Sequence, residues 1–459
     1  MTLWESLVRS DGRPSGALSD AARTVRLADL AGRSFLSGPL ETLRNRSIVL
    51  AIRDPLTAAL AMVELDGIVR RMVLCPAGVA CEHMPHVARM ADADAWVSDA
   101  GGEPPSIQMA VQVEAGRALR PRAGERSESR GTEWVLLTSG TTGAPKLVLH
   151  TLPSLVSAFA GRSEELAAGR VWSTFYDVRR YGGLQILLRA LLAGSLVLPG
   201  PDESIPAFLT RVAAAGVTHI SGTPSHWRKA LMTGAAETIA PAYVRLSGEI
   251  ADQGILDALR NAFPRAVIAH AFASTEAGVA FEVQDGKAGF PAELVERPEH
   301  GVALDVSRGT LRIRSPGNAQ RYLGDGPALK DEDGFVNTGD RLELREGRFY
   351  FMGRTGGVIN VGGLKVHPEE VEAVINAHPA VRMSLVRARR NPITGAIVTA
   401  DVVLERPETD NRSAEGEALR ENILESCRKA LASYKVPAMI RFVPSLDVSA
   451  SGKLVRRDA

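Results

Sequence analysis

Short apolar runs alternate with helix-like segments along the first 270 residues of the chain. The runs are rich in Val, Ile and Leu, and they predict strands at residues 47–52, 72–75, 95–98, 135–138, 196–198, 217–221, 244–246 and 267–271. Between them, apolar side chains with helical spacing predict helices at residues 57–65, 205–215 and 254–263. Strands that alternate with helices predict an α/β fold with largely parallel sheets covered on both faces.

The pattern changes after about Gly301. Residues 310–314 and 348–352 alternate like strands of a small antiparallel unit, and the glycine-rich residues 353–357 predict a flexible joint. Beyond the joint, helices are predicted at residues 368–377 and 416–433, and strands at 383–386 and 398–404. These elements suffice for a separate α+β domain of about a hundred residues.

Composition narrows the class of protein. The chain has 459 residues with 45% hydrophobic and 23% charged side chains, as expected for a soluble protein of two or three domains. A net charge of +1 gives no overall field that favours nucleic acid or membrane, and we interpret the basic residues 117–130 as a solvated loop. The apolar region 184–198 is too short and interrupted for membrane insertion. With three cysteines, we expect a cytoplasmic protein.

Residues 138–146 form the most distinctive local pattern. Four hydroxyl side chains, two glycines and one lysine follow a predicted strand, and this composition suits a loop that wraps phosphate. The spacing differs from the common P-loop, in which a Gly-Lys-Ser/Thr triplet ends the loop. By itself, the segment is equally compatible with a surface turn.

Four further motifs follow in order. They are Phe272-Ala273-Ser274-Thr275-Glu276, Asn337-Thr338-Gly339-Asp340, Gly353-Arg354 and Ser451-Gly452-Lys453. Together with the loop, they resemble the core motifs of the acyl-adenylate-forming (AMP-binding) superfamily, which includes acyl- and aryl-CoA ligases and peptide synthetase adenylation domains. The resemblance extends from about residue 47 to residue 457, and the chain looks like a stand-alone AMP-forming acyl/aryl-CoA synthetase.

The resemblance implies a division of the chain into two domains. Residues 1–355 would form a large ATP- and acid-binding domain, with mostly parallel sheets flanked by helices and a small distorted barrel. Residues 356–459 would form a small, mobile α+β lid that swivels about a hinge near Gly356. Relatives often have Lys or Asp at that position, and a glycine still permits the swivel.

The resemblance also assigns the nucleotide to particular residues. In the family, the hydroxyl-rich loop holds the β- and γ-phosphates of ATP, Phe272 packs on adenine and Asp340 accepts from the ribose hydroxyls. Without the family, Phe272 would be a core side chain, Asp340 a turn residue and Arg354 a surface charge near the hinge. The implied ATP-binding set is Thr138, Ser139, Gly140, Thr141, Thr142, Gly143, Lys146, Gly248, Glu249, Ile250, Phe272, Ala273, Ser274, Thr275, Asp340 and Arg354.

Catalysis is assigned to Lys453, Thr275 and Glu276. Adenylation brings a carboxylate against the α-phosphate of ATP, and a lysine between the two anions stabilises the transition state. In the family, Thr275 contacts the α-phosphate and Glu276 binds Mg²⁺, which prefers carboxylate oxygens. The alternative for Lys453 is a disordered basic tail.

The acid pocket is predicted at Arg180, Tyr181, Gly182 and Ser247. Many carboxylate ligases have a histidine where this chain has Arg180, and an arginine there would pair with a second anionic or polar group of the acid. An outward-facing Arg180 is an equal alternative. Because an arginine near the pocket does not favour a long apolar chain, we expect a small or aromatic carboxylic acid.

The predicted function is that of an ATP- and Mg²⁺-dependent acid–thiol ligase. It forms an acyl-AMP and pyrophosphate, and it then transfers the acyl group to coenzyme A. One alternative is an adenylating enzyme that loads a separate carrier protein. A second is a catalytically degenerate nucleotide-binding protein, because several family positions are altered.

Overall fold

The structure is a computed structural model of the whole chain. It describes residues 2–8, 16–77, 79–99, 109–122, 126, 131–138, 144–159, 169–297, 301–324, 326–391, 395–405, 413–449 and 453–455. Within these residues, the structure contains two eight-stranded sheets, a five-stranded sheet and a C-terminal domain with its own small sheets. No helix in this part of the chain combines the length and apolar character needed to cross a membrane.

The first large sheet carries the strand ends around which the candidate site is built. Its order is β15-β14-β13-β12-β10-β11-β1-β2, parallel from β14 to β1 and antiparallel at both edges. The strands are β1 (Ala17–Ser19), β2 (Thr24–Arg26), β10 (Arg170–Thr174), β11 (Gly194–Val197), β12 (His219–Gly222), β13 (Tyr243–Ser247), β14 (Val267–Ser274) and β15 (Gly278–Val283). Because β12, β13 and β14 are parallel neighbours, their carboxyl ends meet at one edge.

The second large sheet has the order β19-β9-β8-β5-β4-β6-β7-β3 and a parallel centre. Its strands are β3 (Arg33–Leu36), β4 (Ser47–Leu50), β5 (Arg71–Leu74), β6 (Ala95–Asp99), β7 (Val111–Pro121), β8 (Glu133–Thr138), β9 (Lys146–Thr151) and β19 (Arg321–Tyr322). Strands β8 and β9 are antiparallel, and Thr138 pairs with Lys146 at the base of their connection.

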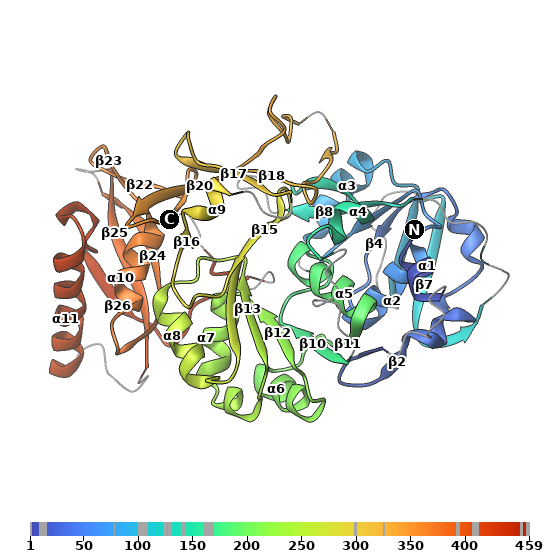
Figure 1. The fold of residues 1–459 in the computed structure, drawn as a ribbon, viewed down its shortest axis with the longest axis horizontal. Helices are drawn as coiled ribbons and strands as arrows, with labels where there is room; N and C mark the ends of the chain where they lie inside the picture. Colours follow the sequence, from blue (N-terminus) through green and yellow to red (C-terminus); the bar gives the residue numbers. More distant parts are fainter. Residues whose placement is uncertain are drawn as a thin grey trace.

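Helices fill the spaces around both sheets. Figure 1 shows α5 (Tyr181–Ala193) between the first sheet and the second, and the side chains of α5, α2 (Pro55–Leu65) and both sheets share one apolar core. Helices α6 (Ile205–Ala214), α7 (Pro224–Met232) and α8 (Gln253–Ala262) cover the other face of the first sheet. The remaining helices of this region are α1 (Leu3–Val8), α3 (Met84–Met90), α4 (Leu152–Val156) and α9 (Glu293–Glu296).

The five-stranded sheet is antiparallel and curves over the large domain as a half-barrel. Its order is β16-β21-β20-β18-β17, with β16 (Phe290–Pro291), β17 (Ala303–Asp305), β18 (Thr310–Arg314), β20 (Val336–Arg345) and β21 (Arg348–Arg354). Strand β21 ends at Arg354, directly before the C-terminal domain. The half-barrel therefore connects the two parts of the molecule.

The C-terminal domain has a core of its own. It contains β22 (Ile359–Val361), β23 (Leu364–Val366), α10 (Pro368–Asn376), β24 (Val381–Asn391), β25 (Gly395–Leu404), α11 (Ala414–Ala430) and β26 (Met439–Phe442). In Figure 1 it lies beside α7 and α8, and the Arg228 guanidinium donates to the carbonyl oxygen of Arg382 at 3.1 Å across this contact.

The interpretation of residues 117–130 as a solvated loop was wrong in its first part. Residues 117–121 belong to β7, which pairs with β3 and β6. The guanidinium groups of Arg122 and Arg126 lie 4.4 and 4.5 Å from the ring centroid of Trp4, and Arg122 also donates to the carbonyl oxygen of Leu30. Arginine side chains can bury their stems and planar heads in this way, so local charge alone does not indicate a loop.

Candidate functional site

Lys453 lies at the centre of the candidate site, although it comes from the far end of the sequence. A Cβ atom added to Gly248, just beyond β13, would lie 3.6 Å from Cε of Lys453. The surrounding protein lowers the pKa of Lys453, chiefly by desolvation of the charged ammonium, and the nearby charges of Arg354 and Arg180 act in the same direction. Glu249 and Asp340 oppose that shift. The structure thus brings four of the predicted residues together around the Lys453 ammonium.

Asp340 and Arg354 face each other across strands β20 and β21. They are direct partners in the strand register, and Nε of Arg354 donates to Oδ1 of Asp340 at 3.1 Å. The other carboxylate oxygen, Oδ2, is buried without a hydrogen-bond partner among the described residues. A buried acceptor without a donor is costly, so Oδ2 fits a ligand that supplies hydroxyl groups.

Thr275 and Glu276 lie on the turn between β14 and β15, and hydrogen bonds hold this turn on several sides. The backbone N–H of Ala277 donates to Oγ of Ser274 at 3.0 Å, and the N–H of Ala319 donates to the carbonyl oxygen of Glu276 at 2.9 Å. Gly278 follows with φ +74°, and an added Cβ would lie 2.6 Å from the carbonyl oxygen of Gly317. The turn therefore presents Thr275 and Glu276 from a fixed backbone.

His150 also holds this turn, a role that no sequence motif indicates. Its Nε2 lies 2.7 Å from the carbonyl oxygen of Thr275, so Nε2 carries the proton and donates. The ring is fully buried, and burial lowers the pKa of His150 to about 4. A neutral histidine of fixed tautomer thus joins β9 to the Thr275 turn.

Glu276 and Lys146 both contact Tyr322. The Tyr322 hydroxyl donates to Oε1 of Glu276 at 3.5 Å, and Nζ of Lys146 lies 5.2 Å from the centre of the Tyr322 ring. Burial and the nearby Glu276 charge raise the pKa of Tyr322 to about 12, so the hydroxyl keeps its proton. No group of three or more metal-ligating side chains exists in the described part of the chain. A single carboxylate fits Mg²⁺, which is usually held by one or two carboxylates together with substrate phosphates.

The other residues predicted to bind the nucleotide lie on β14, after β13 and on the strands beside the hydroxyl-rich loop. The Phe272 ring stacks with Phe351 and Phe281, at centroid distances of 5.4 and 5.9 Å, within an aromatic cluster of the half-barrel. Ala273 and Ser274 continue β14 towards the turn, and Ile250 follows Glu249 with its side chain half-buried. The contact of Phe272 with adenine stays a prediction. Ser139, Gly140, Thr141, Thr142 and Gly143 lie outside the described residues, although Thr138 and Lys146 flank them on paired strands.

The two arginines before α5 have different environments. Arg179 is buried, forms an ion pair with Asp177 at 2.7 Å and donates to the carbonyl oxygen of Ile52, so its role is structural. Arg180 is half-buried, and its Nε has no hydrogen-bond partner within the described part of the chain. Burial lowers the pKa of Arg180, and its charge acts on Lys453. The position of Arg180 in the acid pocket stays a prediction.

Helix α5 begins beside these arginines. Tyr181 is buried, and its ring lies 5.6 Å from the His150 ring. Gly182 packs near the Tyr176 ring, whose hydroxyl donates to the carbonyl oxygen of Ser247 at 2.8 Å. Tyr181, Gly182 and Ser247, all predicted for the acid pocket, thus surround the start of the space between α5 and the first sheet.

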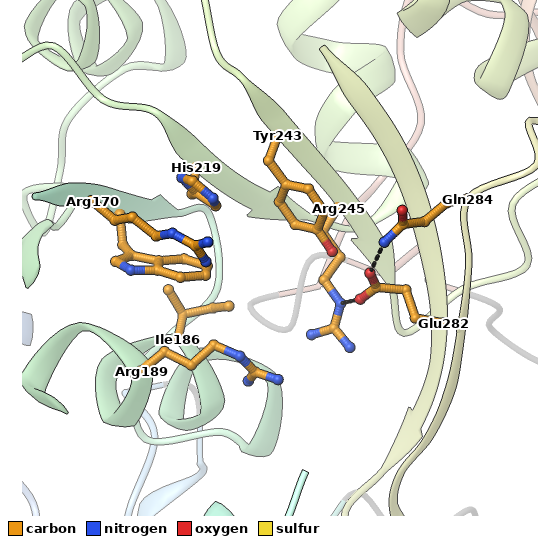
Figure 2. Close-up of a pocket in the computed structure, with 9 residues that line it drawn as sticks. Arg170, Ile186, Arg189, His219, Tyr243, Arg245, Glu282 and Gln284 are labelled. Carbon is orange, nitrogen blue, oxygen red and sulfur yellow. Dashed lines mark hydrogen bonds and ion pairs between the residues drawn. The ribbon is translucent and has the colours of Figure 1, made fainter. Parts of the chain in front are cut away.

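A polar cavity of about 230 Å³ lies further along the same helix and strand. Figure 2 shows Arg189 from α5 and Arg245 from β13 extending into one space, with Glu282 and Gln284 on the opposite side. Arg189 and Arg245 are each only 6% exposed, and Nε of Arg245 lies 2.9 Å from Oε2 of Glu282. No local sequence pattern indicates this cavity, because its residues come from five separate elements.

The cavity wall also contains three neighbouring rings that are tilted against one another. The Trp172 and His219 centroids are 4.6 Å apart, and those of His219 and Tyr243 are 5.4 Å apart. Burial lowers the pKa of His219 to about 4, so the ring is neutral at neutral pH. Three arginines, Arg170, Arg189 and Arg245, then face one carboxylate, that of Glu282. Within the described lining of the cavity, positive charge is therefore in excess beside an aromatic wall.

Comparison with known protein families matches both parts of the chain. The family model described as AMP-binding enzyme matches residues 71–323, and that described as AMP-binding enzyme C-terminal domain matches residues 370–453. A curated relative, 2-succinylbenzoate–CoA ligase from Bacillus cereus (strain Q1), is 27% identical over 341 residues, which cover 71% of this chain and 69% of the relative.

Solved structures share the fold. The o-succinylbenzoate CoA synthetase of Bacillus subtilis, in complex with its acyl-adenylate, has a TM-score of 0.75 at 20% identity and covers 99% of this chain and 97% of its own. The anthranilate CoA ligase AuaEII has a TM-score of 0.80 at 18% identity, and the match covers 99% of this chain and 95% of the ligase. The amide bond synthetase McbA from Marinactinospora thermotolerans has a TM-score of 0.78 at 20% identity, and the match covers 98% of this chain and 97% of the synthetase. These matches confirm the predicted fold.

Proposed function

Since this chain belongs to the AMP-binding enzyme family, we propose that it is an ATP-dependent ligase that activates a carboxylic acid as acyl-AMP and passes the acyl group to coenzyme A. The relatives named as CoA ligases support the acceptor. The observation that carries the proposal is the position of Lys453 against Gly248, Glu249, Asp340 and Arg354.

The first step joins the acid to AMP. A carboxylate oxygen attacks the α-phosphorus of ATP, a new P–O bond forms, and the bond to the bridging oxygen breaks as pyrophosphate leaves with the electron pair. Lys453 is proposed to lie between the two anions, where its positive charge would offset their repulsion in the transition state. Its lowered pKa follows from partial desolvation, which also strengthens its electrostatic effect.

The remaining site residues position the nucleotide. The unpartnered Oδ2 of Asp340 is the proposed acceptor for ribose hydroxyls, and Thr275 is the proposed contact to the α-phosphate. Glu276 would hold Mg²⁺, which neutralises phosphate charge when bound. Lys146 and the loop before it are proposed to hold the β- and γ-phosphates.

In the second step, the sulfur of coenzyme A attacks the acyl carbonyl carbon. A C–S bond forms, AMP leaves with the electrons of the C–O bond, and the thiol proton passes to solvent. We place the boundary between residues 1–355 and 356–459, with the C-terminal domain turning about Gly356 between the steps. Gly356 is exposed, and an added Cβ would meet nothing within 4 Å, so the surroundings leave space for such a turn.

The cavity along α5 supports a particular class of acid. Tyr243, Arg245 and Ser247 lie on one face of β13, so Arg245 is about 7 Å from Ser247 along the strand. From Tyr181 to Arg189, α5 rises by about 12 Å. An acid with its reacting carboxylate near Ser247 and Lys453 would thus reach the cavity with its far end. We propose an aromatic acid with a second anionic group, which the arginines would bind and the ring wall would pack against.

The test is acid-dependent exchange between ATP and pyrophosphate, over a panel of carboxylic acids. We expect exchange with the wild-type chain, and Lys453→Ala should reduce its rate by about a hundredfold while ATP binding changes little. Lys287→Ala, which removes an exposed lysine beyond β15, is the matched control and should retain the wild-type rate.

A panel of acceptors then tests the second step. Coenzyme A should give a thioester, whereas transfer only to a holo carrier protein or only to an amine would replace coenzyme A in the proposal. Absence of exchange with every acid would instead indicate a nucleotide-binding protein without ligase activity.

A further inference from the structure

Glu249 joins two segments that lie far apart in the sequence. Its carboxylate accepts from the backbone N–H of Ser225 at 2.9 Å and from the Ser225 hydroxyl at 3.0 Å. The same carboxylate accepts from the backbone N–H of Leu454 at 3.0 Å, across 205 residues of sequence. One side chain of the large domain therefore holds the peptide that directly follows Lys453.

Helix α7 fixes the Glu249 carboxylate. Ser225 is buried in the first turn of α7, where backbone N–H groups lack partners within the helix. A carboxylate at this end also gains from the helix dipole. Because both contacts to Ser225 come from a rigid helix end, Glu249 presents Oε1 to Leu454 from a fixed position.

The described residues on either side of the Lys453 segment pair with each other. The N–H of Ser449 donates to the carbonyl oxygen of Lys453 at 2.8 Å, and Val448 forms an isolated antiparallel bridge with Leu454. The Leu454 side chain packs in a small apolar cluster with Leu446 of the same domain and Met232 of α7. The hydrogen bond to Glu249 adds a directional contact to this apolar one.

We propose that Glu249 is a positioning residue that latches the Lys453 segment onto α7 for adenylation and releases it before acyl transfer. This inference rests on the proposed function. It assigns the Glu249 carboxylate to the C-terminal domain instead of the ATP-binding set that the family resemblance implied. The latch is a single charge-assisted hydrogen bond, so it is strong enough to orient the lysine and weak enough to break in each cycle.

The latch predicts that loss of Glu249 slows adenylation but not acyl transfer. Glu249→Ala should lower kcat of acid-dependent ATP–pyrophosphate exchange by about tenfold, because Lys453 is less often in place. The KM for ATP should change little. The rate at which added acyl-adenylate is converted to the coenzyme A thioester should also change little, since the latch is open in that step. Glu249→Gln keeps an acceptor oxygen for Leu454 and should restore part of the exchange rate.

Hydrogen exchange provides a readout that needs neither acid nor activity. In the full-length protein, Glu249→Ala should accelerate amide exchange of the peptide that spans residues 447–455 by about tenfold, and Glu249→Gln should accelerate it less. Peptides from β12 and β13 serve as internal controls and should keep their wild-type exchange. Acceleration throughout the first sheet would mean that Glu249 acts only on the fold, which would overturn the latch.

The outcomes separate the latch from the proposed function. Unchanged exchange of the 447–455 peptide in Glu249→Ala would refute the latch, whether or not the chain is a ligase. A latch found by hydrogen exchange in a chain without ATP–pyrophosphate exchange would refute the ligase and keep the contact. A large rise in KM for ATP without faster amide exchange would indicate that Glu249 binds the nucleotide.

Discussion

At the residue scale, three arginines in and before α5 show how environment decides function. Arg179 has a carboxylate partner in Asp177 and is part of the core. Arg180 is half-buried, its Nε has no hydrogen-bond partner among the described residues, and its charge lowers the pKa of Lys453. Arg189 lies two turns further along the helix, at the cavity beside Glu282. Identical side chains on one short stretch of chain thus lie in three different environments.

Arg189→Gln tests the proposed class of acid. We expect the KM for 2-succinylbenzoate, used as a probe with two carboxylates, to rise by about tenfold, because loss of one charged hydrogen bond costs about 1.5 kcal/mol. The KM for ATP should stay unchanged. Steady-state pyrophosphate release at varied acid concentration measures both constants.

The matched control is 4-oxo-4-phenylbutanoate, which lacks only the ring carboxylate of that probe. Its KM should hardly change in Arg189→Gln if the arginine binds the second anion. Equal rises for both acids would show that Arg189 shapes the pocket by packing, through its contact with the Phe159 ring at 4.4 Å.

At the element scale, α5 connects the reaction centre with the cavity, so the placement of its first turn matters for both. A Cβ atom on Gly183 would lie 2.3 Å from the carbonyl oxygen of Asp177, a backbone atom that cannot move alone. A Cβ atom on Gly182 would meet the Tyr176 ring at 3.5 Å, an ordinary contact. Neighbouring glycines of one helix therefore differ in what they tolerate.

Gly183→Ala should destabilise the protein, and Gly182→Ala should not. Overpacking of this size costs about 1–3 kcal/mol, which corresponds to a fall of about 1–4 °C in Tm for a domain of this length. In Gly182→Ala, the better helix propensity of alanine should leave Tm unchanged or slightly raised. Thermal unfolding of both variants, followed by circular dichroism, makes the comparison. Similar Tm values for the two variants would contradict the close approach of Gly183 to Asp177.

The elements of the fold could largely be predicted, because buried parallel strands leave continuous apolar runs. Residues 47–52 and 267–271, for example, correspond to β4 and β14. The extension of β7 into the basic residues 117–121 was missed, since its arginines satisfy contacts with β3 and Trp4 that local sequence does not reveal. The bond between His150 and Thr275 was missed for the same reason, as it spans 125 residues.

At the scale of the whole molecule, the site exists only because the C-terminal domain lies against α7 and α8. Asp252, the N-cap of α8, forms an ion pair with Arg228 and accepts from Nδ2 of Asn376 at 3.3 Å. Glu249 binds Leu454 at the same interface. Motif order predicted that Lys453 would be catalytic, but the contacts that bring it to β13 are tertiary. These contacts join residues that lie up to 205 positions apart, so local sequence patterns do not reveal them.

The segment that connects the two domains needs backbone freedom for the proposed turn, and this need can be tested directly. Two half-reactions on one site require the C-terminal domain to turn, and a turn needs at least one residue whose backbone angles change. Gly356 follows β21 directly after Arg354 and Thr355, its φ is not in the left-handed region, and its surroundings are open. Alanine should therefore be accepted at this position, whereas proline would fix φ near −65° and remove the freedom to rotate.

We expect Gly356→Pro to keep acid-dependent ATP–pyrophosphate exchange within about threefold of wild type and to lower coenzyme A thioester formation by about tenfold or more. Gly356→Ala, the matched control, should support both half-reactions. Single-turnover assays of each half-reaction make the distinction, because steady-state turnover reports only the slower step. Equal loss of both activities in Gly356→Pro would indicate a damaged fold. Wild-type thioester formation would place the hinge at another residue of the segment after β21, so the ratio of the two rates locates the turn.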